Sequence, residues 1–536
     1  MIVKKAIALL LGLILVCASI SGCTDKKEAT SQTGEIVSEA LEYPIKTDAT
    51  LTYWVPFDVT TLNSGSDLGD TELYKELEKR TGVKIEFIHP VAGQETEQFN
   101  LRVASGDLPD MMTFNFLTSF PGGPDKAIDT DVITSLNDLI PIYAPNLSAV
   151  LQKDQELDKM IKTDSNNYYV FPFVRNDDYL TIYMGPMLRA DWLEELGLSV
   201  PETIDEWYNV LKAFKNEKKA QAPLSIQTFL NTVRTTSAFV GAYGVKDDFY
   251  VENGKVVFGP IEPGYKEYLA TMNKWYKEGL LDNDFATTER SSLNAKLLSD
   301  QTGATVGWTG GTMGTFLDTM KEENPEADLV ATPYPVLKKG STPKFGHNTP
   351  RFTGATSVAI SAKSKHKEIA AKWLDYGYSE EGHMLLNFGI EGVSYEMADG
   401  YPKYTEFITN NPDGLAMSSI MPQYMTSTYG GPMLQDRRYM EQYSKYDQQK
   451  NALDVWAKTT EKDYLFPAVT RTADEDRTYS SIMNDINTYR EEMILKFILG
   501  QEPISNFDKY VEVIKSMGID EAIKINQEAL KRYNAR

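Results

Sequence analysis

An early stretch of hydrophobic and polar positions predicts a β-α-β unit. Residues 51–57 are apolar and suit a strand that ends at Pro56, since proline cannot donate to a sheet. A helix is predicted from an N-cap at Asp70 to a C-cap at Gly82, because apolar residues recur at helical spacing between them. Residues 83–87 then alternate in the way of a half-buried strand.

The alternation of strands and helices continues along the chain. A second helix is predicted at residues 95–105 and the next strand at 111–114, and residues 356–362 and 365–377 predict a later strand and helix. This order indicates an α/β fold with a mostly parallel sheet. Ligands of such sheets bind beyond the carboxyl ends of the strands.

Local signals predict several further elements. Residues 203–206 (TIDE) and 472–475 (TADE) both form a T-x-x-E capping box, and the second starts a long amphipathic helix that ends at Gly500. Asn-Gly at residues 253–254, between β-prone arms, predicts a tight hairpin. Aromatic and apolar residues at helical spacing within 265–276 predict a helix face that packs in the core rather than on a sugar.

The N-terminal segment has the pattern of a secretory signal. Residues 4–5 are lysines, residues 6–20 are apolar, and small residues precede Cys23. The apolar run is short for a membrane span, which needs about 20 residues. The junction resembles the lipobox of bacterial lipoproteins, in which the cysteine is acylated and becomes the new N-terminus; an ordinary signal peptide with an incidental Cys23 is the alternative. We expect residues 1–22 to be a lipoprotein signal peptide, residues 23–44 a flexible tether, and the protein to be lipid-anchored on the extracytoplasmic side of the cell membrane.

The composition restricts both partners and chemistry. The chain carries 76 acidic and 54 basic residues, a formal net charge of −22, and we expect no nucleic-acid partner because this charge repels phosphate backbones. Of the two cysteines, Cys17 lies in the signal segment and Cys23 is the predicted acylation site, so no thiol is left for a disulfide or a thiolate metal site. The length indicates two or three domains, and we expect a monomer.

Residues for catalysis form no recognised pattern. The four histidines, His89, His347, His366 and His383, have no metal-ligand spacing, and the sequence contains neither a nucleophile elbow nor a P-loop. We therefore predict that the protein is not an enzyme and has no cofactor and no metal site. With 76 acidic residues some carboxylate pair can meet the spacing of a glycosidase, so a secreted glycoside hydrolase stays an alternative.

Several motifs, in a fixed order along the chain, resemble those of one family. Residues 103–110 (VASGDLPD), 135–140 (SLNDLI), 188–197 (LRADWLEELG) and 201–207 (PETIDEW) resemble elements of the extracellular solute-binding proteins, family 1-like, that serve carbohydrate ABC transporters. Residues 389–402 (GIEGVSYEMADGYP) resemble a segment of the large lipoprotein branch of this family. The resemblance extends over essentially the whole chain after the signal segment.

The resemblance implies an α/β, two-lobed periplasmic-binding-protein-like fold with a hinge and a central ligand cleft. One lobe would comprise residues 45–165 with 335–400, and the other residues 166–334 with 401–536. The implied function is that of the extracellular substrate-binding subunit of an ABC importer, which captures an oligosaccharide by hinge closure and delivers it to permease subunits. An oligopeptide-binding lipoprotein is the alternative within this class.

The candidate ligand contacts lie at expected strand ends, in glycine-rich loops or on the family motifs. Sugars stack on aromatic rings and hydrogen-bond to planar polar side chains, so the candidates are of both kinds. They are Trp54, Phe114, Asn115, Arg189, Trp308, Arg351, Glu391, Tyr395, Tyr424 and Tyr429. Trp308 stands out because the small residues of the segment 301–314 leave room for its ring to face a cleft. A buried ring beside a turn is the alternative for Trp308, and packing in the core or at the surface is the alternative for each of the others.

One loop departs from the family pattern. Some relatives carry a calcium loop resembling an EF-hand after the helix that starts at residues 203–206, because alternating oxygen ligands suit this hard cation. Residues 215–222 (KNEKKAQA) hold three lysines and one carboxylate instead, so we predict no calcium there. The cluster at residues 282–284 (DND) lacks the glycine and the glutamate of such a loop and is predicted to be a solvated turn.

Overall fold

The computed structural model describes residues 42–57, 67–428 and 430–536. The predicted signal peptide, the acylation site Cys23, most of the predicted tether and the candidate Tyr429 lie outside the described residues. Strands and helices alternate along the described chain, as expected for an α/β protein.

The first sheet has four strands in the order β10-β3-β1-β2. Its strands are β1 (Thr50–Trp54), β2 (Lys84–Ile88), β3 (Met111–Thr113) and β10 (Val358–Ile360). β1 pairs in parallel with β2 and β3, while β10 pairs antiparallel to β3 at one edge. The predicted β-α-β unit is therefore confirmed, and the sheet is mostly parallel.

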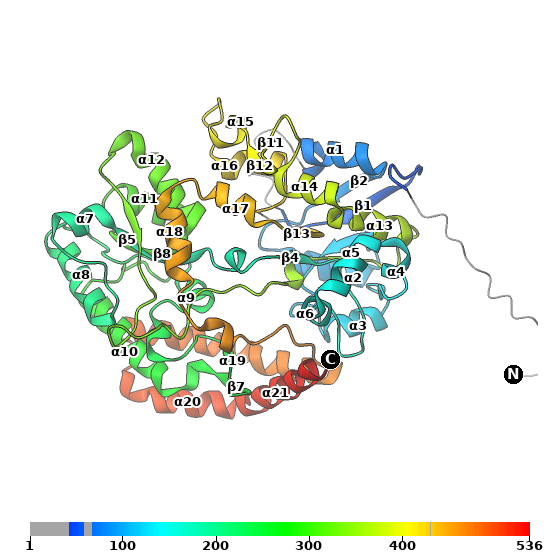
Figure 1. Ribbon diagram of the computed structural model, residues 1–536. Coiled ribbons are helices and arrows are strands. Elements are labelled where there is room, and N and C mark those ends of the chain that lie inside the picture. The colour runs from blue at the N-terminus through cyan, green and yellow to red at the C-terminus, as the bar shows by residue number, and fades with distance from the viewer. Residues whose placement is uncertain (1–41, 58–66, 429) are drawn as a thin grey trace, which may run out of the picture. The chain divides into compact units, whose positions relative to one another are not determined.

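Helices flank this sheet and complete a first hydrophobic core. They are α1 (Glu72–Thr81), α2 (Glu95–Ser105), α3 (Gly123–Asp129), α4 (Ile140–Tyr143), α5 (Pro145–Lys153), α6 (Gln155–Met160), α13 (Lys367–Asp375) and α14 (Glu380–Phe388). The first core unites buried residues from 45–174 and 352–386 with Met433. In Figure 1 the first sheet and these helices occupy the right-hand side of the view.

The predicted helix caps hold with one exception. Gly82 and Gly106 end α1 and α2 in the left-handed conformation, as predicted. The N-cap of α1 is Thr71 and not Asp70, because the Thr71 hydroxyl accepts the hydrogen bond from the backbone N–H of Tyr74. The prediction of Asp70 as the cap was wrong by one residue, since the neighbouring threonine is also a favoured N-cap residue.

A second sheet has three strands in the order β8-β5-β9, all pairs antiparallel. Its strands are β5 (Met184–Arg189), β8 (Ala304–Trp308) and β9 (Leu329–Ala331), and the hairpin β6 (Phe249–Glu252) and β7 (Lys255–Phe258) lies apart from it in the sheet order. The hairpin turn at residues 253–254, both with positive φ, was predicted and is confirmed.

The second sheet belongs to a second hydrophobic core. Its helices are α7 (Ala190–Glu195), α8 (Ile204–Asn216), α9 (Phe229–Thr236), α10 (Pro263–Lys277), α11 (Arg290–Leu298), α12 (Thr315–Glu323), α18 (Asp447–Trp456), α19 (Ala473–Leu499), α20 (Phe507–Ser516) and α21 (Ile519–Ala535). Both capping boxes form, at the starts of α8 and α19. The apolar face predicted within residues 265–276 packs in this core, which unites buried residues from 182–334 and 452–533.

A smaller third core was not anticipated. It contains Leu180, Leu453 and buried residues from 388–440. Its elements are β11 (Tyr395–Ala398), β12 (Tyr401–Tyr404), α15 (Glu406–Thr409), α16 (Met417–Ile420) and α17 (Arg437–Tyr443). Because this core takes residues from both predicted lobes, the lobe boundaries given above stay a prediction.

One parallel strand pair joins segments that are far apart in the sequence. β4 (Phe173–Arg175) pairs with β13 (Met433–Gln435), and Arg175 lies opposite Gln435 in the register. The two strands connect the first core to α17 of the third core, and this is where the candidate site begins.

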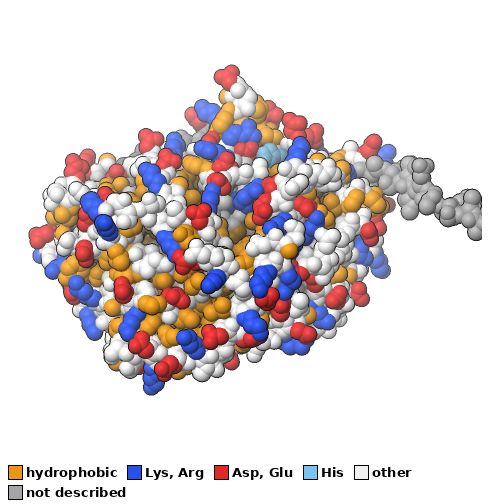
Figure 2. Space-filling view, turned by 60° about the horizontal axis from the view of Figure 1, so that its bottom comes forward, with side chains coloured by type: hydrophobic (Ala, Val, Ile, Leu, Met, Phe, Trp, Pro, Cys, Tyr) orange, Lys and Arg blue, Asp and Glu red, His pale blue; other side chains and the backbone are white. Residues whose placement is uncertain are grey.

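Acidic and basic side chains are interspersed over the face shown in Figure 2. Among the helices of the described residues, none has the length and hydropathy needed to span a membrane.

Candidate functional site

A cavity of about 370 Å³ lies where elements of all three cores meet. Aromatic rings and planar polar groups form much of its wall, with small residues between them. The lining residues are Phe173, Arg175, Leu180, Tyr183, Arg290, Trp308, Thr309, Gly310, Gly311, Ser418, Thr428, Gln435, Tyr439, Met440 and Tyr443. Rings beside hydrogen-bonding groups are what a sugar requires of a binding site.

Three of the lining side chains stand at the carboxyl ends of strands. Arg175 ends β4, Gln435 ends β13 and Trp308 ends β8. β4 and β13 are parallel, so their carboxyl ends lie at the same edge. This placement agrees with the rule that α/β proteins bind ligands beyond the carboxyl ends of their strands.

The segment after Trp308 is a π-helical turn, Thr309–Gly314, that leads into α12. A Cβ at Gly310 would meet Cε1 of Tyr443 at 2.3 Å, and a Cβ at Gly311 would meet Nη2 of Arg290 at 1.8 Å. The two glycines therefore allow an aromatic ring and a guanidinium group to lie directly against the backbone. Because glycine has no side chain, these two positions allow Tyr443 and Arg290 to form part of the cavity wall.

Hydrogen bonds from the side-chain nitrogen fix Gln435 in place. Its Nε2 donates to the carbonyl oxygen of Ser427 at 2.5 Å and to the hydroxyl of Tyr439 at 3.1 Å. Its buried Oε1 has no hydrogen-bond partner among the described residues. A buried amide oxygen without a partner costs free energy, so this atom is suited to accept a ligand hydroxyl.

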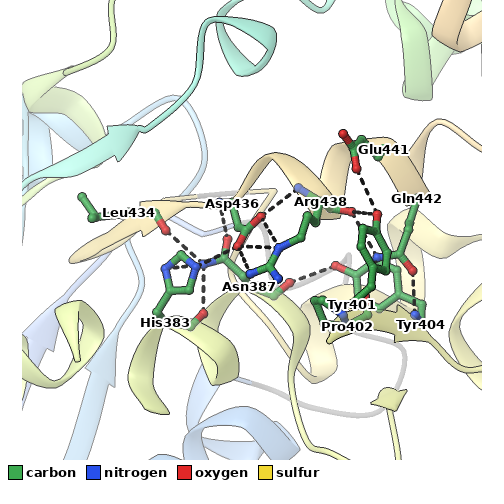
Figure 3. A network of polar contacts seen from close by, with 10 residues as sticks. All are labelled: His383, Asn387, Tyr401, Pro402, Tyr404, Leu434, Asp436, Arg438, Glu441 and Gln442. Atoms are coloured by element: carbon green, nitrogen blue, oxygen red, sulfur yellow. Dashed lines mark hydrogen bonds and ion pairs between the residues drawn. The ribbon is translucent and has the colours of Figure 1, made fainter. Parts of the chain in front are cut away.

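A polar network next to the cavity holds α17, the helix that carries Tyr439, Met440 and Tyr443 (Figure 3). Asp436 caps this helix by accepting from the backbone N–H of Arg438 at 2.8 Å. Burial alone would raise the pKa of Asp436, but hydrogen bonds from His383 and Arg438 outweigh burial and hold the pKa well below its usual range. The carboxylate is therefore charged at neutral pH and keeps the helix start in place.

Asn387 ties the same helix to α14 and β13. Its Nδ2 donates to the carbonyl oxygens of His383 at 2.9 Å and Leu434 at 3.0 Å, and its Oδ1 accepts from the backbone N–H of Asp436 at 2.8 Å. Tyr404 adds a hydrogen bond from its hydroxyl to the carbonyl oxygen of Asn387 at 2.9 Å (Figure 3). The network joins α14, β13 and α17 and thereby supports the part of the cavity wall that α17 carries.

Buried His347 supports another ring of the wall. Its imidazole is in edge contact with Tyr183, with ring centroids 4.5 Å apart, and Nε2 lies 3.1 Å from the hydroxyl of Thr349. Burial, with smaller contributions from the cations Arg175 and Lys246, lowers the pKa of His347 to about 3. The imidazole is therefore neutral under physiological conditions and acts as a packing group.

A second cavity of about 280 Å³ continues the first one past Gly310, Ser418 and Tyr443, which line both. Its wall includes Asp318 and Lys445, which form an ion pair with each other. The shared residues place the two cavities next to each other beside the π-helical turn and α17.

Trp308 is the one candidate ligand residue among those the structure describes that lines the main cavity. The guanidinium carbon of Arg290 lies 5.6 Å from the centroid of its ring. The side chain is half-buried and belongs to none of the three cores. The structure thus favours the cleft-facing interpretation of Trp308 over the core one, and contact with a ligand stays a prediction.

The other predicted ligand residues that the structure describes lie elsewhere. Trp54 and Phe114 are buried in the first core and Tyr395 in the third, where their rings fill space between elements. Arg189 is 1% exposed, and its ion pairs with Asp191 and Asp300 use its hydrogen-bond donors.

The remaining candidates within the described residues are not on this cavity wall either. The guanidinium of Arg351 is paired with Asp154, with Nη2 2.7 Å from a carboxylate oxygen, and Asn115 caps the turn after β3 through a bond from the backbone N–H of Thr118. Glu391 is exposed, and Tyr424 packs against the third core. The geometry gives these residues no support as ligand contacts in the main cavity.

Sequence reasoning missed most of the cavity wall. Tyr183, Tyr439, Tyr443, Arg175 and Arg290 come from segments that carry no motif. One signal was available, because Arg175 follows two apolar residues at the end of a short strand, and strand ends are where ligands of α/β sheets bind. Nothing in the sequence placed Arg290 or the tyrosines of α17 opposite that strand.

The acidic turn at residues 282–284 differs from the prediction at Asp282, while Asn283 and Asp284 are exposed as expected. Asp282 is buried rather than solvated, and its carboxylate accepts from Lys296 Nζ at 2.5 Å and from the hydroxyl of Ser225 at 2.5 Å. Burial favours the neutral form of Asp282, but these partners outweigh it and lower the pKa. In the described part of the chain no three acidic, histidine or cysteine side chains are grouped so that they could hold a metal ion.

Comparisons with known proteins agree with this architecture. The family described as bacterial extracellular solute-binding protein matches residues 65–384, more than half of the chain. Lipoprotein LipO of Bacillus subtilis (strain 168) is 25% identical over 534 residues, which cover 96% of each protein. The fructooligosaccharide ABC transporter substrate-binding protein FusA of Streptococcus pneumoniae serotype 4 is 24% identical over 552 residues, covering 97% of this chain and 96% of FusA.

Solved structures show the same fold. The crystal structure of the alginate-binding protein AlgQ2 without calcium ion is similar with a TM-score of 0.76 and 25% identity, and the match covers 91% of this chain and 99% of AlgQ2. FusA in complex with kestose is similar with a TM-score of 0.72 and 22% identity, covering 91% of this chain and 100% of FusA. The fold is the periplasmic-binding-protein-like fold of these proteins, as predicted, and the chain belongs to the family of bacterial extracellular solute-binding proteins.

Proposed function

We propose that this protein is the extracellular substrate-binding subunit of an ABC importer and that it captures an oligosaccharide in the cavity around Trp308. Closure of the surrounding elements on the ligand would present the bound form to membrane permease subunits. Because elements of all three cores form the cavity wall, a ligand there would touch each of them, as ligand-driven closure requires.

The composition of the cavity wall is the observation that carries this proposal. Five aromatic rings and three planar polar side chains surround about 370 Å³, with an unpaired amide oxygen on Gln435. Sugar rings offer C–H faces to aromatic rings and hydroxyl groups to such polar atoms. The carbohydrates in the names of FusA and AlgQ2 support the same class of ligand.

Binding without chemical change is the second part of the proposal. Hydrolysis of a glycosidic bond uses two carboxyl groups on either side of the bond. The residues that line the main cavity include no aspartate or glutamate, and the carboxylate of Asp318 in the adjoining cavity is paired with Lys445. A wall dominated by rings also suits sugars better than extended peptides, which bind largely through backbone hydrogen bonds.

The anchor and the location are also part of the proposal. We propose that Cys23 carries the lipid, that residues 1–22 are removed, and that the protein works as a monomer outside the cell membrane. The lipobox-like sequence before Cys23 and the similarity to a protein named lipoprotein LipO support this arrangement. Two acyl chains give the stable attachment that one chain does not.

Capture from a mixture tests the proposal. The purified protein is incubated with glycan and peptide fragments, separated from unbound material and denatured, and the released ligand is identified by mass spectrometry. An intact oligosaccharide is the expected result, with its affinity then measured by calorimetry. Release of peptides alone would move the protein to the oligopeptide class, and a shortened glycan would make it a hydrolase.

A further inference from the structure

The charge of the main cavity has the opposite sign to that of the chain. The sequence carries a formal net charge of −22, yet the charged side chains that line the cavity are the two arginines Arg175 and Arg290. No aspartate or glutamate is among the lining residues. The acidic residue that lines the adjoining cavity is Asp318, and it forms an ion pair with Lys445.

Arg290 has no carboxylate partner among the described residues. Its guanidinium lies over the ring of Trp308 and against the backbone of Gly311, where a Cβ would be 1.8 Å from Nη2. These contacts hold the group at the cavity wall and leave its hydrogen-bond donors without an anionic acceptor. The side chain is exposed, so it is accessible to a ligand.

Arg175 has the same character on another side of the cavity. Its guanidinium carbon lies 5.3 Å from the ring centroid of Phe173 and 5.9 Å from that of Tyr183. Its one side-chain hydrogen bond with a described residue is a long one, 3.5 Å, from Nη1 to the carbonyl oxygen of Pro350. The side chain therefore keeps most of its five donors available.

The arginines around the cavity contrast with others in the chain. Arg189, Arg351 and Arg438 each form an ion pair with an aspartate. A half-buried guanidinium without an anion loses hydration and gains no compensating charge. Arg175 is such a group, and Arg290 stands exposed on the same cavity wall without a carboxylate partner among the described residues. Two arginines of this kind in one cavity are best explained by an anionic ligand.

Ligand chemistry identifies that partner. A guanidinium is a donor only, and its planar fork matches a carboxylate by two parallel hydrogen bonds. Sugar hydroxyls both donate and accept, whereas the two arginines offer donors alone and no carboxylate lines this cavity. We propose, building on the proposed function, that the ligand is an acidic oligosaccharide whose ring carboxylates pair with Arg290 and Arg175 while a ring stacks on Trp308.

The test begins with capture from a mixture of equal amounts of uronate fragments, prepared from pectin and alginate, and neutral fragments, prepared from fructan, starch and galactan. We expect the protein to retain uronate fragments. Calorimetry then compares the captured fragment with its methyl ester, which keeps the sugar ring and removes the charge. Esterification is expected to weaken binding roughly ten- to hundredfold, as for the loss of hydrogen bonds between charged partners.

Variants assign the effect to the cavity. Arg290→Gln is expected to weaken binding of the uronate roughly ten- to hundredfold and to leave binding of the ester nearly unchanged, and Arg290→Lys is expected to fall between, because a lysine keeps the charge but not the fork. Arg290 is exposed, so both variants should fold, and a thermal melt checks this. Arg477→Gln is the matched control, since it removes the same charge from an exposed site on α19 where Arg477 pairs with Asp474.

The outcomes separate this inference from the proposed function. Capture of neutral fragments alone, or equal binding of uronate and ester in the wild-type protein, would overturn the acidic ligand and leave carbohydrate capture intact. Equal losses of uronate affinity in Arg290→Gln and Arg477→Gln would show that the effect comes from the net charge of the protein. That result would overturn the role of the cavity. Failure to retain any saccharide would overturn the proposed function and this inference with it.

Discussion

Replacing Trp308 by alanine tests whether its ring belongs to the ligand or to the fold. The ring is half-buried at the end of β8, lines the cavity and belongs to none of the three cores. Its contact with Arg290, at 5.6 Å, is a cation–π interaction of about 0.5 to 1 kcal/mol at an exposed site. We expect Trp308→Ala to lower the free energy of unfolding by less than about 1.5 kcal/mol, because little core packing is lost.

The expected effect on binding is larger. A ring that stacks on a ligand in the centre of a site contributes about 1 to 3 kcal/mol on truncation, which corresponds to a loss of affinity of roughly five- to 150-fold. Trp275→Ala is the matched control, because Trp275 is 1% exposed in the second core and does not line the cavity. Its loss should cost about 3 to 5 kcal/mol of stability and leave the affinity per folded molecule unchanged.

Denaturant unfolding and calorimetric titration of the captured glycan measure the two quantities separately. The reasoning predicts a large change in affinity with a small change in stability for Trp308→Ala, and the reverse for Trp275→Ala. If Trp308→Ala loses about 3 kcal/mol or more of stability and its folded fraction binds as the wild type does, the ring is a structural one and the stacking argument fails.

Three other predictions address the anchor, pH dependence and metal content. Cys23→Ala, expressed in a lipoprotein-processing host, should move the protein from the membrane fraction to the soluble one, and unchanged membrane retention would contradict acylation at Cys23. The pKa of His347 is about 3 in the folded state, below its usual value of 6.5, so the unfolded chain binds the extra proton between these values. The contribution of His347 to the free energy of unfolding is therefore complete above about pH 6.5 and falls on acidification by up to about 1.4 kcal/mol per pH unit. His347→Gln should remove this part of the pH slope when unfolding is measured from about pH 7 to 5. An unchanged slope would refute the assignment. Elemental analysis of the dialysed protein should find no stoichiometric calcium, since residues 215–222 carry three lysines, and one bound calcium per chain would contradict this.

Elements with strong local signals were predictable from the sequence. The capping boxes at residues 203–206 and 472–475 begin α8 and α19 as expected, and Gly500 ends α19. The Asn-Gly pair at residues 253–254 forms the turn between β6 and β7. These features depend on neighbours within a few residues, so the sequence contains the relevant interactions.

The cavity wall could not be predicted in the same way, because distant segments form it. Trp308 was found through its glycine-rich surroundings, and the structure shows why the glycines matter: Gly310 and Gly311 make room for Tyr443 and Arg290. Tyr443 lies on α17, whose position depends on the pairing of β13 with β4 and on the network around Asp436. Long-range pairings of this kind leave no mark in a local pattern of residues.

The misplaced candidates are residues of types that occur both in protein cores and in ligand clefts. Trp54 ends a parallel strand, as a ligand residue would, but its ring packs on Phe99 in the first core. Arg189 lies on a family motif, but ion pairs with two aspartates occupy its donors. Residue type and position in a motif are the same for a ligand contact and for a packing residue, and burial decides between them.

A crystal structure of the protein with the glycan that it captures tests the central claim most directly. The account predicts an intact oligosaccharide in the cavity between the three cores, with one sugar ring stacked on Trp308 and within hydrogen-bond distance of Gln435 and Arg290. A glycan bound elsewhere on the protein, with this cavity occupied by solvent alone, would contradict it.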